Sequence, residues 1–291
     1  MRPKLSIVTP SFNQGQFLEE TILSVLNQNY PNLEHIIIDG GSTDESVQII
    51  RRYEKHLAYW VSEKDRGQVH ALNKGLARAT GEIFAFLNSD DLYLPGAFDA
   101  VIAHFENNPS CEWLCGDTIM FGIGPEELIR TVVPKSAAHA LSWAYKAPQP
   151  GMFWKRELIL SGFDEKWQYD FDHDMYVRLL LRGHNCEHLP VTLAKYRLHA
   201  QSKTVAENYK QIEEFDRSAE VYENQLRGAD RRWCAATRYL RRSYAASETG
   251  NSREGARWLV RAIATYPECL ASRPFWGTLR RVFTDPNGAR H

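Results

Sequence analysis

The chain has 291 residues, of which 43% are hydrophobic and 24% charged, and its formal net charge is −1. A chain of this length can form one catalytic domain of about two hundred residues plus an appendage. A sequence pI near 6.8 argues against a nucleic-acid-binding protein. The five cysteines are odd in number and show no CxxC pair, which argues against a disulfide framework and predicts reduced thiols.

The sequence starts its first core strand at Leu5, which leaves no space for a signal peptide. No apolar stretch approaches the roughly 20 residues that a membrane-spanning helix needs. We therefore expect a soluble protein of the cytoplasm.

Strand and helix patterns alternate through the first part of the chain. An apolar strand over Leu5–Thr9, which the following proline is expected to end, leads into an amphipathic helix. A second strand, His35–Ile38, runs into the glycine-containing segment Asp39–Asp44, where Ser42 or Thr43 can cap the next helix. Repeated strand–helix units predict right-handed crossovers and an α/β fold with a mainly parallel sheet. Neither a GxGxxG nor a P-loop sequence is present.

An acidic pair follows the third of these units. A helical face over Gln68–Ala79 precedes the apolar strand Ile83–Leu87, and Asp90 and Asp91 come directly after that strand. Carboxylates at the C-terminal end of a buried strand suit a divalent metal whose shell is completed by substrate phosphates. The alternative is an Asp-Asp turn with solvated side chains.

A second acidic segment lies on a helix predicted in the second half of the chain. Asp174 and Arg178 are four residues apart and are expected to pair along this helix. Asp172 lies near the helix N-terminus, where its carboxylate can point into a cleft. Alternatively, Asp172 is only the N-cap of the helix.

Five ordered segments resemble the motifs of family 2 glycosyltransferases, which have the GT-A fold. The segments are TPSFNQ (Thr9 to Gln14), DGGSTD (Asp39 to Asp44), DRGQVHALNKG (Asp65 to Gly75), NSDD (Asn88 to Asp91) and FDEKWQYDFDHDMYVRLLLRG (Phe163 to Gly183). The match spans residues 4 to 204. This resemblance implies a Rossmann-like, mainly parallel sheet flanked by helices.

The same resemblance implies an inverting transfer of a sugar from a nucleotide-sugar donor to an acceptor hydroxyl, with Mn²⁺ or Mg²⁺ as cofactor. Asp39 would contact the nucleotide base, and Asp90 with Asp91 would handle ribose, diphosphate and metal. Many members carry Asp-x-Asp where this chain has Asn88-Ser89-Asp90, so which of the two aspartates binds the metal directly stays open. Asp172 would be the base that deprotonates the acceptor.

Further site residues follow from the resemblance. The segment Tyr196–His199 resembles the family's R-x-H segment, so His199 would complete the metal shell or touch the diphosphate, and Arg197 would neutralise it. A surface or packing role is the alternative for this histidine. Asp117 and Gln149 are assigned to the acceptor or diphosphate side. The residues assigned to donor binding are Thr9, Pro10, Ser11, Asn13, Asp39, Arg66, Asn73 and Asp90.

Strand signals disappear after Thr204, so we predict a GT-A catalytic domain over residues 1–204 and a helical extension over residues 205–291. From Arg227 to His291 there are thirteen Arg or Lys residues against five Asp or Glu. Such a basic surface can rest on anionic lipid at the inner face of the membrane. A solvated helix surface, a packing element and a homodimer contact are the alternatives.

The sequence leaves the substrates open. The donor is expected to be a UDP-, dTDP- or GDP-sugar, and the acceptor a sugar or a lipid-linked acceptor in bacterial cell-surface polysaccharide or glycolipid assembly. A nucleotidyltransferase is the enzymatic alternative, but that class usually shows a Gly-rich basic loop after the first strand, which TPSFNQ lacks. A catalytically inactive nucleotide-sugar-binding module is the other alternative, and the joint presence of Asp39, Asp90, Asp91 and Asp172 argues against it.

Overall fold

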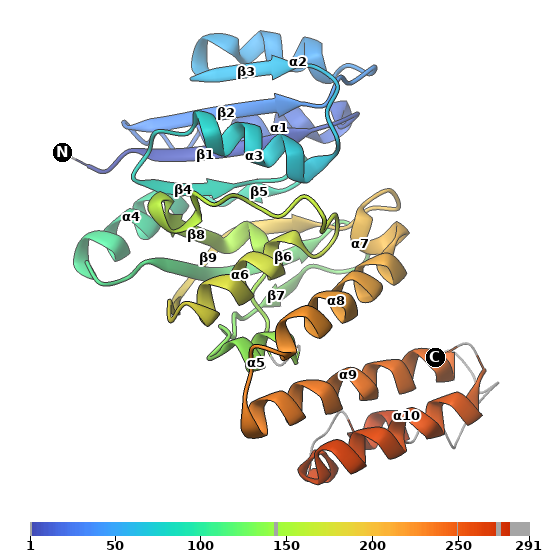
Figure 1. Cartoon of the computed structure of the whole chain (residues 1–291). Helices are drawn as coiled ribbons and strands as arrows, with labels where there is room; N and C mark the ends of the chain where they lie inside the picture. The colour runs from blue at the N-terminus through green and yellow to red at the C-terminus, as the bar shows by residue number, and fades with distance from the viewer. Residues whose placement is uncertain (1, 143–144, 249, 272–274, 280–291) are drawn as a thin grey trace. The chain divides into compact units, whose positions relative to one another are not determined.

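The computed structural model describes residues 2–142, 145–248, 250–271 and 275–279 of the chain (Figure 1). The chain divides into two compact units, the first made of Met1–Lys135 with Tyr145–Glu214 and the second of Ser136–Ala144 with Phe215–His291. Residues 205–214 therefore lie with the first unit, although the sequence analysis assigns them to the helical extension. The domain division after Thr204 stays a prediction.

Nine strands form one sheet in the described part of the first unit, in the order β3-β2-β1-β4-β8-β6-β9-β5, with β7 paired to β6. β1 to β4 run parallel, as the strand–helix alternation predicts, and β9 is parallel to β6. β8 is antiparallel to both β4 and β6, which makes the sheet mixed. The strands are β1 (Leu5–Ser11), β2 (Leu33–Asp39), β3 (Tyr59–Ser62), β4 (Ile83–Phe86), β5 (Leu92–Tyr93), β6 (Trp113–Phe121), β7 (Glu127–Ile129), β8 (Met152–Lys155) and β9 (Cys186–Arg197).

Helices cover both faces of this sheet (Figure 1). Alternate residues of each strand point to opposite faces, so a strand that is covered on both faces buries both sets of side chains, most of them apolar. α3 (Gln68–Arg78) and α6 (Phe171–Leu181) bury Leu72 and Met175 on one face, and α1 (Gly15–Leu26), α2 (Ser46–Tyr53) and α4 (Ala97–Asn107) pack on the other. Short 3₁₀ segments, η1 (Glu54–His56), η2 (Gln149–Gly151) and η3 (Arg156–Ile159), connect the elements.

The close packing of α3 on β1 depends on a glycine. A Cβ atom at Gly75 would lie 2.4 Å from Val8 Cγ1, closer than two non-bonded carbon atoms can approach. Any other residue at this position would push α3 away from the sheet. The short distance between α3 and β1 therefore depends on Gly75, and α3 carries Gln68 at its N-terminal end.

Two local predictions from the sequence are wrong. β1 continues through Pro10 to Ser11, because β1 pairs with β4 only as far as Val8 and the N–H that Pro10 lacks would point beyond that ladder. Neither Ser42 nor Thr43 caps α2. Instead, Asp44 Oδ1 accepts a hydrogen bond from the backbone N–H of Ser46 at 3.0 Å, since the Ser42 hydroxyl is bonded to Asp39.

The second unit is helical, as predicted for the C-terminal extension. It contains α5 (Ala137–Leu141), α9 (Gly228–Glu248), α10 (Ser252–Thr265), η4 (Pro267–Ala271) and the later part of α8 (Asn208–Glu223), which follows α7 (Lys203–Ala206) of the first unit. Leu240, Leu259 and Phe275 belong to its apolar core. The Ser243 hydroxyl donates to the Gly255 carbonyl at 2.7 Å, which ties α9 to α10. In the described ranges, no helix combines the length and apolar character that crossing a bilayer requires.

Several arginines of the second unit are neutralised within it. The guanidinium of Arg238 is bonded to Glu223 at 3.0 Å and to Glu220 at 2.6 Å, and its side chain is only 6% exposed. Arg241 and Arg242 both bond to Asp216. The excess of basic residues counted in the sequence is therefore not all surface charge.

Candidate active site

A cavity of about 750 Å³ lies where the parallel strands of the first unit end. Its size falls in the range of small-molecule sites, roughly 300 to 1,000 Å³. The wall takes residues from the carboxyl ends of β1, β2, β3, β4 and β9, which is the edge where open α/β sheets bind ligands. Among the lining residues are Pro10, Ser11, Phe12, Gly41, Thr43, Lys64, Asp65, Gln68, Asn88, Asp90, Tyr196, Arg197 and Lys203.

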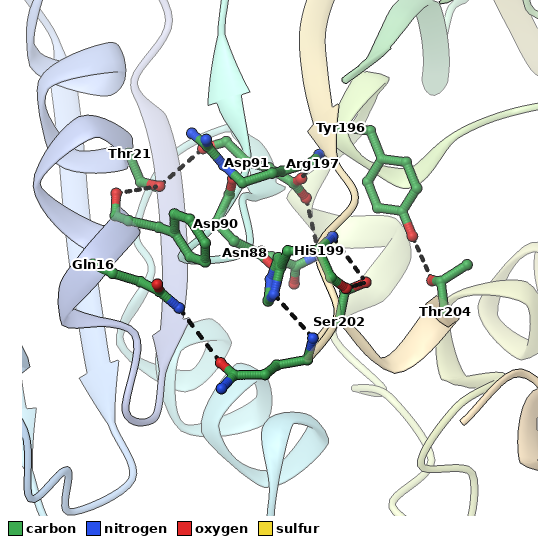
Figure 2. Close-up of polar contacts among 12 residues, drawn as sticks. Gln16, Thr21, Asn88, Asp90, Asp91, Tyr196, Arg197, His199, Ser202 and Thr204 are labelled. Atoms are coloured by element: carbon green, nitrogen blue, oxygen red, sulfur yellow. Dashed lines mark hydrogen bonds and ion pairs between the residues drawn. The ribbon is translucent and has the colours of Figure 1, made fainter. Parts of the chain in front are cut away.

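The two adjacent aspartates after β4 have different environments (Figure 2). Asp90 lines the cavity, and its Oδ2 lies 3.0 Å from His199 Nε2. Asp91 is fully buried, and its Oδ1 accepts the backbone N–H of Arg197 at 2.9 Å. Burial, followed by the charge of Asp90, raises the pKa of Asp91 well above its usual value. Asp90 is thus placed toward a ligand, whereas Asp91 fixes the end of β9.

Asn88 joins this acidic pair to two other segments. Its Oδ1 accepts a hydrogen bond from Gln68 Nε2 at 2.7 Å, and its Nδ2 donates to Asp91 Oδ2 at 3.2 Å. The same amide nitrogen is 3.4 Å from Gln149 Oε1, while Gln149 Nε2 donates to the Phe86 carbonyl at 2.8 Å. A neutral amide therefore occupies the position where many members of the resembled family carry a carboxylate, and it lowers the negative charge of the site.

Arg197 holds the backbone of the acidic pair. Its Nε donates to the Asp90 carbonyl at 2.8 Å, and another guanidinium nitrogen pairs with Glu20. The guanidinium lies over the rings of Phe17 and Phe121, 4.7 Å and 4.4 Å from their centroids. These contacts fix the guanidinium beside the cavity that Arg197 also lines.

The loops after β1 and β2 are bonded to each other. Asn13 adopts a left-handed backbone with φ of 51°, its N–H donates to Ser42 Oγ at 2.8 Å, and its Oδ1 accepts from Thr43 N at 2.8 Å. Asp39 is fully buried, and its carboxylate accepts hydrogen bonds from Gly41 N, from Ser42 and from Ser62 Oγ. Asp39 and Asn13 therefore shape the wall formed by Ser11, Gly41 and Thr43.

Asp172 lies in the first turn of α6, next to a buried histidine–aspartate pair. The N-cap of α6 is Asp170, not Asp172, so the N-cap alternative for Asp172 is wrong. Asp170 Oδ2 lies 3.2 Å from His173 Nδ1, and the ring of Tyr145 stacks on His173 at 5.8 Å. Burial, followed by the charge of Asp170, raises the pKa of Asp172 to about 6. At that pKa the carboxylate can exchange a proton near neutral pH.

The predicted helical ion pair of α6 is confirmed. Arg178 Nε donates to Asp174 Oδ2 at 2.8 Å, and Asp174 is fully buried. Arg178 also donates to the Gly162 carbonyl at 3.0 Å, which ties α6 to the loop before it. Asp174 is thus a structural carboxylate two residues from Asp172.

Sequence comparison places the chain among known proteins. Residues 6–150 match the family described as "Glycosyl transferase family 2". An uncharacterized glycosyltransferase of Mycobacterium tuberculosis is 34% identical over 197 residues, which cover 66% of this chain and 72% of that protein. The chain belongs to glycosyltransferase family 2. A shorter match, 43% identical over 95 residues, joins 31% of this chain to 37% of TuaG from Bacillus subtilis, which is named for teichuronic acid biosynthesis.

Solved structures show that this family 2 glycosyltransferase has the GT-A fold. TarS of S. aureus, solved with UDP-GlcNAc, superposes with a TM-score of 0.68 at 16% identity and covers 96% of this chain and 88% of its own. The mannosyltransferase PcManGT of Pyrobaculum calidifontis, solved with GDP-Man and Mn²⁺, gives a TM-score of 0.64 at 20% identity, with 97% and 84% covered. At these identities the likeness establishes the fold, as the resemblance predicted.

Some residues predicted for the donor side of this glycosyltransferase lie away from the cavity wall. Thr9 is fully buried and its hydroxyl is 3.1 Å from His35 Nε2. Asn73 exchanges two hydrogen bonds of 2.8 Å with the backbone of Phe163, and Arg66 pairs with Glu165 at 2.9 Å. The sequence alone does not show whether a motif residue such as Asn73 or Arg66 binds the substrate or another segment of the chain.

Asp117 was assigned to the acceptor side. In the structure its carboxylate is bonded to the segment after β7 and to β9. It lies within β6 rather than after a shorter strand, and it is 4% exposed. Its Oδ1 accepts from Thr131 N and is bonded to His188 Nε2, both at 2.8 Å. The contact with acceptor stays a prediction for this residue.

The sequence analysis missed Lys203, which follows the last motif of the glycosyltransferase. Its Nζ donates to Gln68 Oε1 and to the Gln168 carbonyl, both at 3.0 Å, and the side chain lines the cavity. Burial lowers the pKa of Lys203, while the charges of Glu207, Glu214 and Asp172 act in the opposite direction. The Lys203 cation thus lies at the cavity wall and is attracted by the charge of Asp172. The sequence signal that could have identified Lys203 is its position four residues after His199 of the R-x-H segment.

Two other contributions to the site also escaped the sequence analysis. The ring of Phe12 lines the cavity and the residue is 59% exposed, so it offers an apolar surface to a planar ligand. Glu214 in α8 accepts the N–H groups of Tyr169 and Asp170 at 2.7 Å and 3.2 Å, which caps the start of α6 from a distant part of the chain. Caps that come from another element leave no local sequence pattern.

Proposed function

We propose that this chain is an inverting, metal-dependent glycosyltransferase that moves a sugar from a nucleotide-sugar donor to an acceptor hydroxyl. The observation that carries the proposal is the Asp90 carboxylate at the cavity wall, with the His199 imidazole 3.0 Å from it. Family membership supplies the reaction class, and the cavity supplies room for a donor of this size.

Asp90 and His199 are the proposed metal ligands. A carboxylate oxygen and an imidazole nitrogen suit Mn²⁺ and leave positions for diphosphate oxygens, so the donor set fits the cofactor. A divalent cation held there would stabilise the charge that develops on the leaving diphosphate. Asp91, also predicted as a ligand, is proposed instead to orient Asp90 and β9, because its oxygens are bonded to Arg197 N and Asn88. Lys203 and Arg197 would add positive charge on the diphosphate side.

The nucleotide is proposed to lie against the loops after β1 and β2. Phe12 can stack on a base, and Ser11, Gly41 and Thr43 offer polar groups around it. Asp39 is proposed to act through the loop it holds, in addition to the base contact that the family resemblance suggests. TarS and PcManGT bind UDP-GlcNAc and GDP-Man respectively, which supports a nucleotide-sugar donor without selecting its base.

Asp172 is proposed as the catalytic base. Its carboxylate is ionised above a pH of about 6 and can accept the proton of an acceptor hydroxyl as that oxygen attacks the anomeric carbon. Attack from the face opposite the leaving diphosphate inverts the configuration. Gln149 and Asp117 remain the proposed acceptor-side residues, and the acceptor is proposed to be a sugar or a lipid-linked acceptor. The relation to TuaG, which is named for teichuronic acid biosynthesis, supports a role in cell-surface polysaccharide assembly.

Peripheral contact with the membrane is proposed for α10. Arg253, Arg257 and Arg261 are exposed and four residues apart on this helix, and Val260 beside them is 65% exposed. A stripe of arginines with an apolar neighbour suits anionic lipid headgroups. This would place the enzyme at the inner face of a membrane, next to a lipid-linked acceptor.

A panel of UDP-, dTDP- and GDP-sugars with Mn²⁺ tests the reaction. We expect one donor class to raise the thermal stability of the protein and to release nucleoside diphosphate with an acceptor, giving a product of inverted configuration. Release of pyrophosphate from a nucleoside triphosphate and a sugar phosphate, with no transfer from any nucleotide sugar, would instead identify a nucleotidyltransferase. A product that retains the donor configuration would contradict a single displacement with Asp172 as base.

A further inference from the structure

A second group of metal-binding side chain types lies outside the donor cavity. His104 from the last turn of α4, Cys111 from the turn before β6 and Glu187 near the start of β9 each present one ligand atom, and these atoms all lie within 4.8 Å of one another. His104 Nε2 is 2.9 Å from Glu187 Oε2. Three separate elements therefore converge on one point.

The backbone around this group is held by regular hydrogen bonds. Cys111 N donates to the Asn108 carbonyl at 2.9 Å, and Asn108 Nδ2 donates to the His104 carbonyl at 2.9 Å. Glu187 pairs with Leu114 in the parallel ladder of β6 and β9. The ligand atoms are thus positioned by the sheet and by the end of α4, as a preorganised site requires.

Burial leaves the group accessible from one side. Cys111 is 1% exposed, whereas the side chains of His104 and Glu187 are 17% and 39% exposed. The sulfur atom therefore lies at the inner end, and an ion can enter past the imidazole and the carboxylate.

The donor set favours a borderline or soft divalent cation. A neutral imidazole, a thiolate and a carboxylate carry two negative charges together, which balance Zn²⁺ and leave a fourth tetrahedral position for water. Without a cation, burial and then the charge of Glu187 raise the pKa of Cys111 to about 12, so the group holds a neutral thiol. Lys155 acts against that shift and Glu112 adds to it. Metal binding would displace the thiol proton.

We propose that His104, Cys111 and Glu187 form a zinc site that joins α4 to the edge of the sheet where β9 begins. The site would be separate from the donor cavity, because Glu187 precedes Arg197 by ten positions on β9, which corresponds to roughly 30 Å of strand. The cation proposed for the nucleotide-sugar site is a different ion, held by Asp90, His199 and diphosphate oxygens. The competing arrangement is a His104–Glu187 ion pair beside a buried thiol.

Cobalt substitution distinguishes the two arrangements. The full-length protein carrying Asp90→Ala, which removes the donor metal ligand, is freed of metal and titrated with Co²⁺. We expect a thiolate-to-cobalt charge-transfer band that saturates at one equivalent, and Zn²⁺ should abolish this band and raise the unfolding temperature. Cys111→Ser should remove the band, whereas Cys234→Ser, at a buried cysteine of the second unit, should keep it.

His104 and Glu187 are partly exposed, so substitutions at these two ligands are expected to leave the fold intact. His104→Gln and Glu187→Gln should weaken Co²⁺ binding at least tenfold while thermal unfolding without metal changes little. The site would be overturned if no charge-transfer band appeared at one equivalent, or if the band persisted in Cys111→Ser. It would also be overturned if both glutamine variants bound Co²⁺ as tightly as the Asp90→Ala protein without them. Nucleoside diphosphate binding with Mn²⁺, measured in the same variants with Asp90 restored, reports on the donor site separately.

Discussion

The candidate site carboxylates of the first unit differ in their partners from the arginine-paired carboxylates of the second unit. In the described part of the first unit, Asp90 faces a cavity with a histidine as its side-chain partner, and Asp172 has no arginine or lysine bonded to it. In the second unit, Asp216 and Glu223 are each bonded to arginines of α9. A carboxylate without a permanent cation is available to bind a metal or a proton, whereas a paired one stabilises the fold.

The strongest test of this contrast is Asp172→Asn. The variant keeps the size of the side chain but cannot accept a proton, so turnover should fall by about 10² to 10⁴ while donor affinity stays within about twofold. Asp164→Asn, at a partly exposed aspartate paired with Lys166, is the matched control and should change turnover little. If Asp172→Asn kept near-normal turnover, the catalytic base would have to be another carboxylate.

A second test separates the adjacent aspartates after β4. Asp90→Asn should weaken Mn²⁺-dependent binding of a nucleoside diphosphate by about 10²-fold, equivalent to about 2.8 kcal/mol, as calorimetry can measure. Asp91→Asn should keep that affinity within about threefold. It should lower the free energy of unfolding by about 1–3 kcal/mol instead, since its new amide would face Asn88 Nδ2. The reverse outcome would make Asp91 the metal ligand.

The arginines of the second unit provide the next comparison. Arg238→Ala leaves Glu223 without its partner and should lower the free energy of unfolding in urea by about 2 kcal/mol. Arg257→Ala removes an exposed charge and should change stability by less than about 0.5 kcal/mol. Arg257→Ala should also weaken binding to anionic liposomes about fivefold, because each basic residue near the surface contributes about 1 kcal/mol. Equal binding of wild type to neutral and anionic liposomes would contradict the membrane proposal.

The smallest expected effect is a shift of the pH profile. Only the ionised carboxylate of Asp172 can accept a proton, so kcat/KM should fall as pH decreases below about 6, the pKa that burial and Asp170 produce. Asp170→Asn removes a neighbouring negative charge, which should lower the pKa of Asp172 and move the acid limb to lower pH. Asp99→Asn, exposed on α4, should leave the profile unchanged. An unmoved limb in Asp170→Asn would show that burial alone sets this pKa.

Much of the fold followed from local patterns. The parallel strands β1, β2 and β4 and the helices α1, α2 and α3 were predicted, because apolar periodicity is a property of neighbouring residues, whereas β3 was not predicted. The error at Pro10 arose because the deciding partner is another strand, β4, whereas the error at the cap of α2 arose because Ser42 bonds to Asp39, three residues before it. The position of Asp90 after β4 and the pairing of Asp174 with Arg178 were likewise local consequences of the sequence.

The sequence by itself determined the family, the strand–helix order and the set of acidic residues that reach the strand ends. Only the tertiary structure decided that Asp90 faces the cavity while Asp91 is buried, and it did so through the end of β9, whose Arg197 N–H binds Asp91. His199 and Lys203 lie more than a hundred residues from Asp90 along the chain but share its site. Burial and charge depend on what packs nearby in space, and adjacent residues in sequence can therefore have opposite roles.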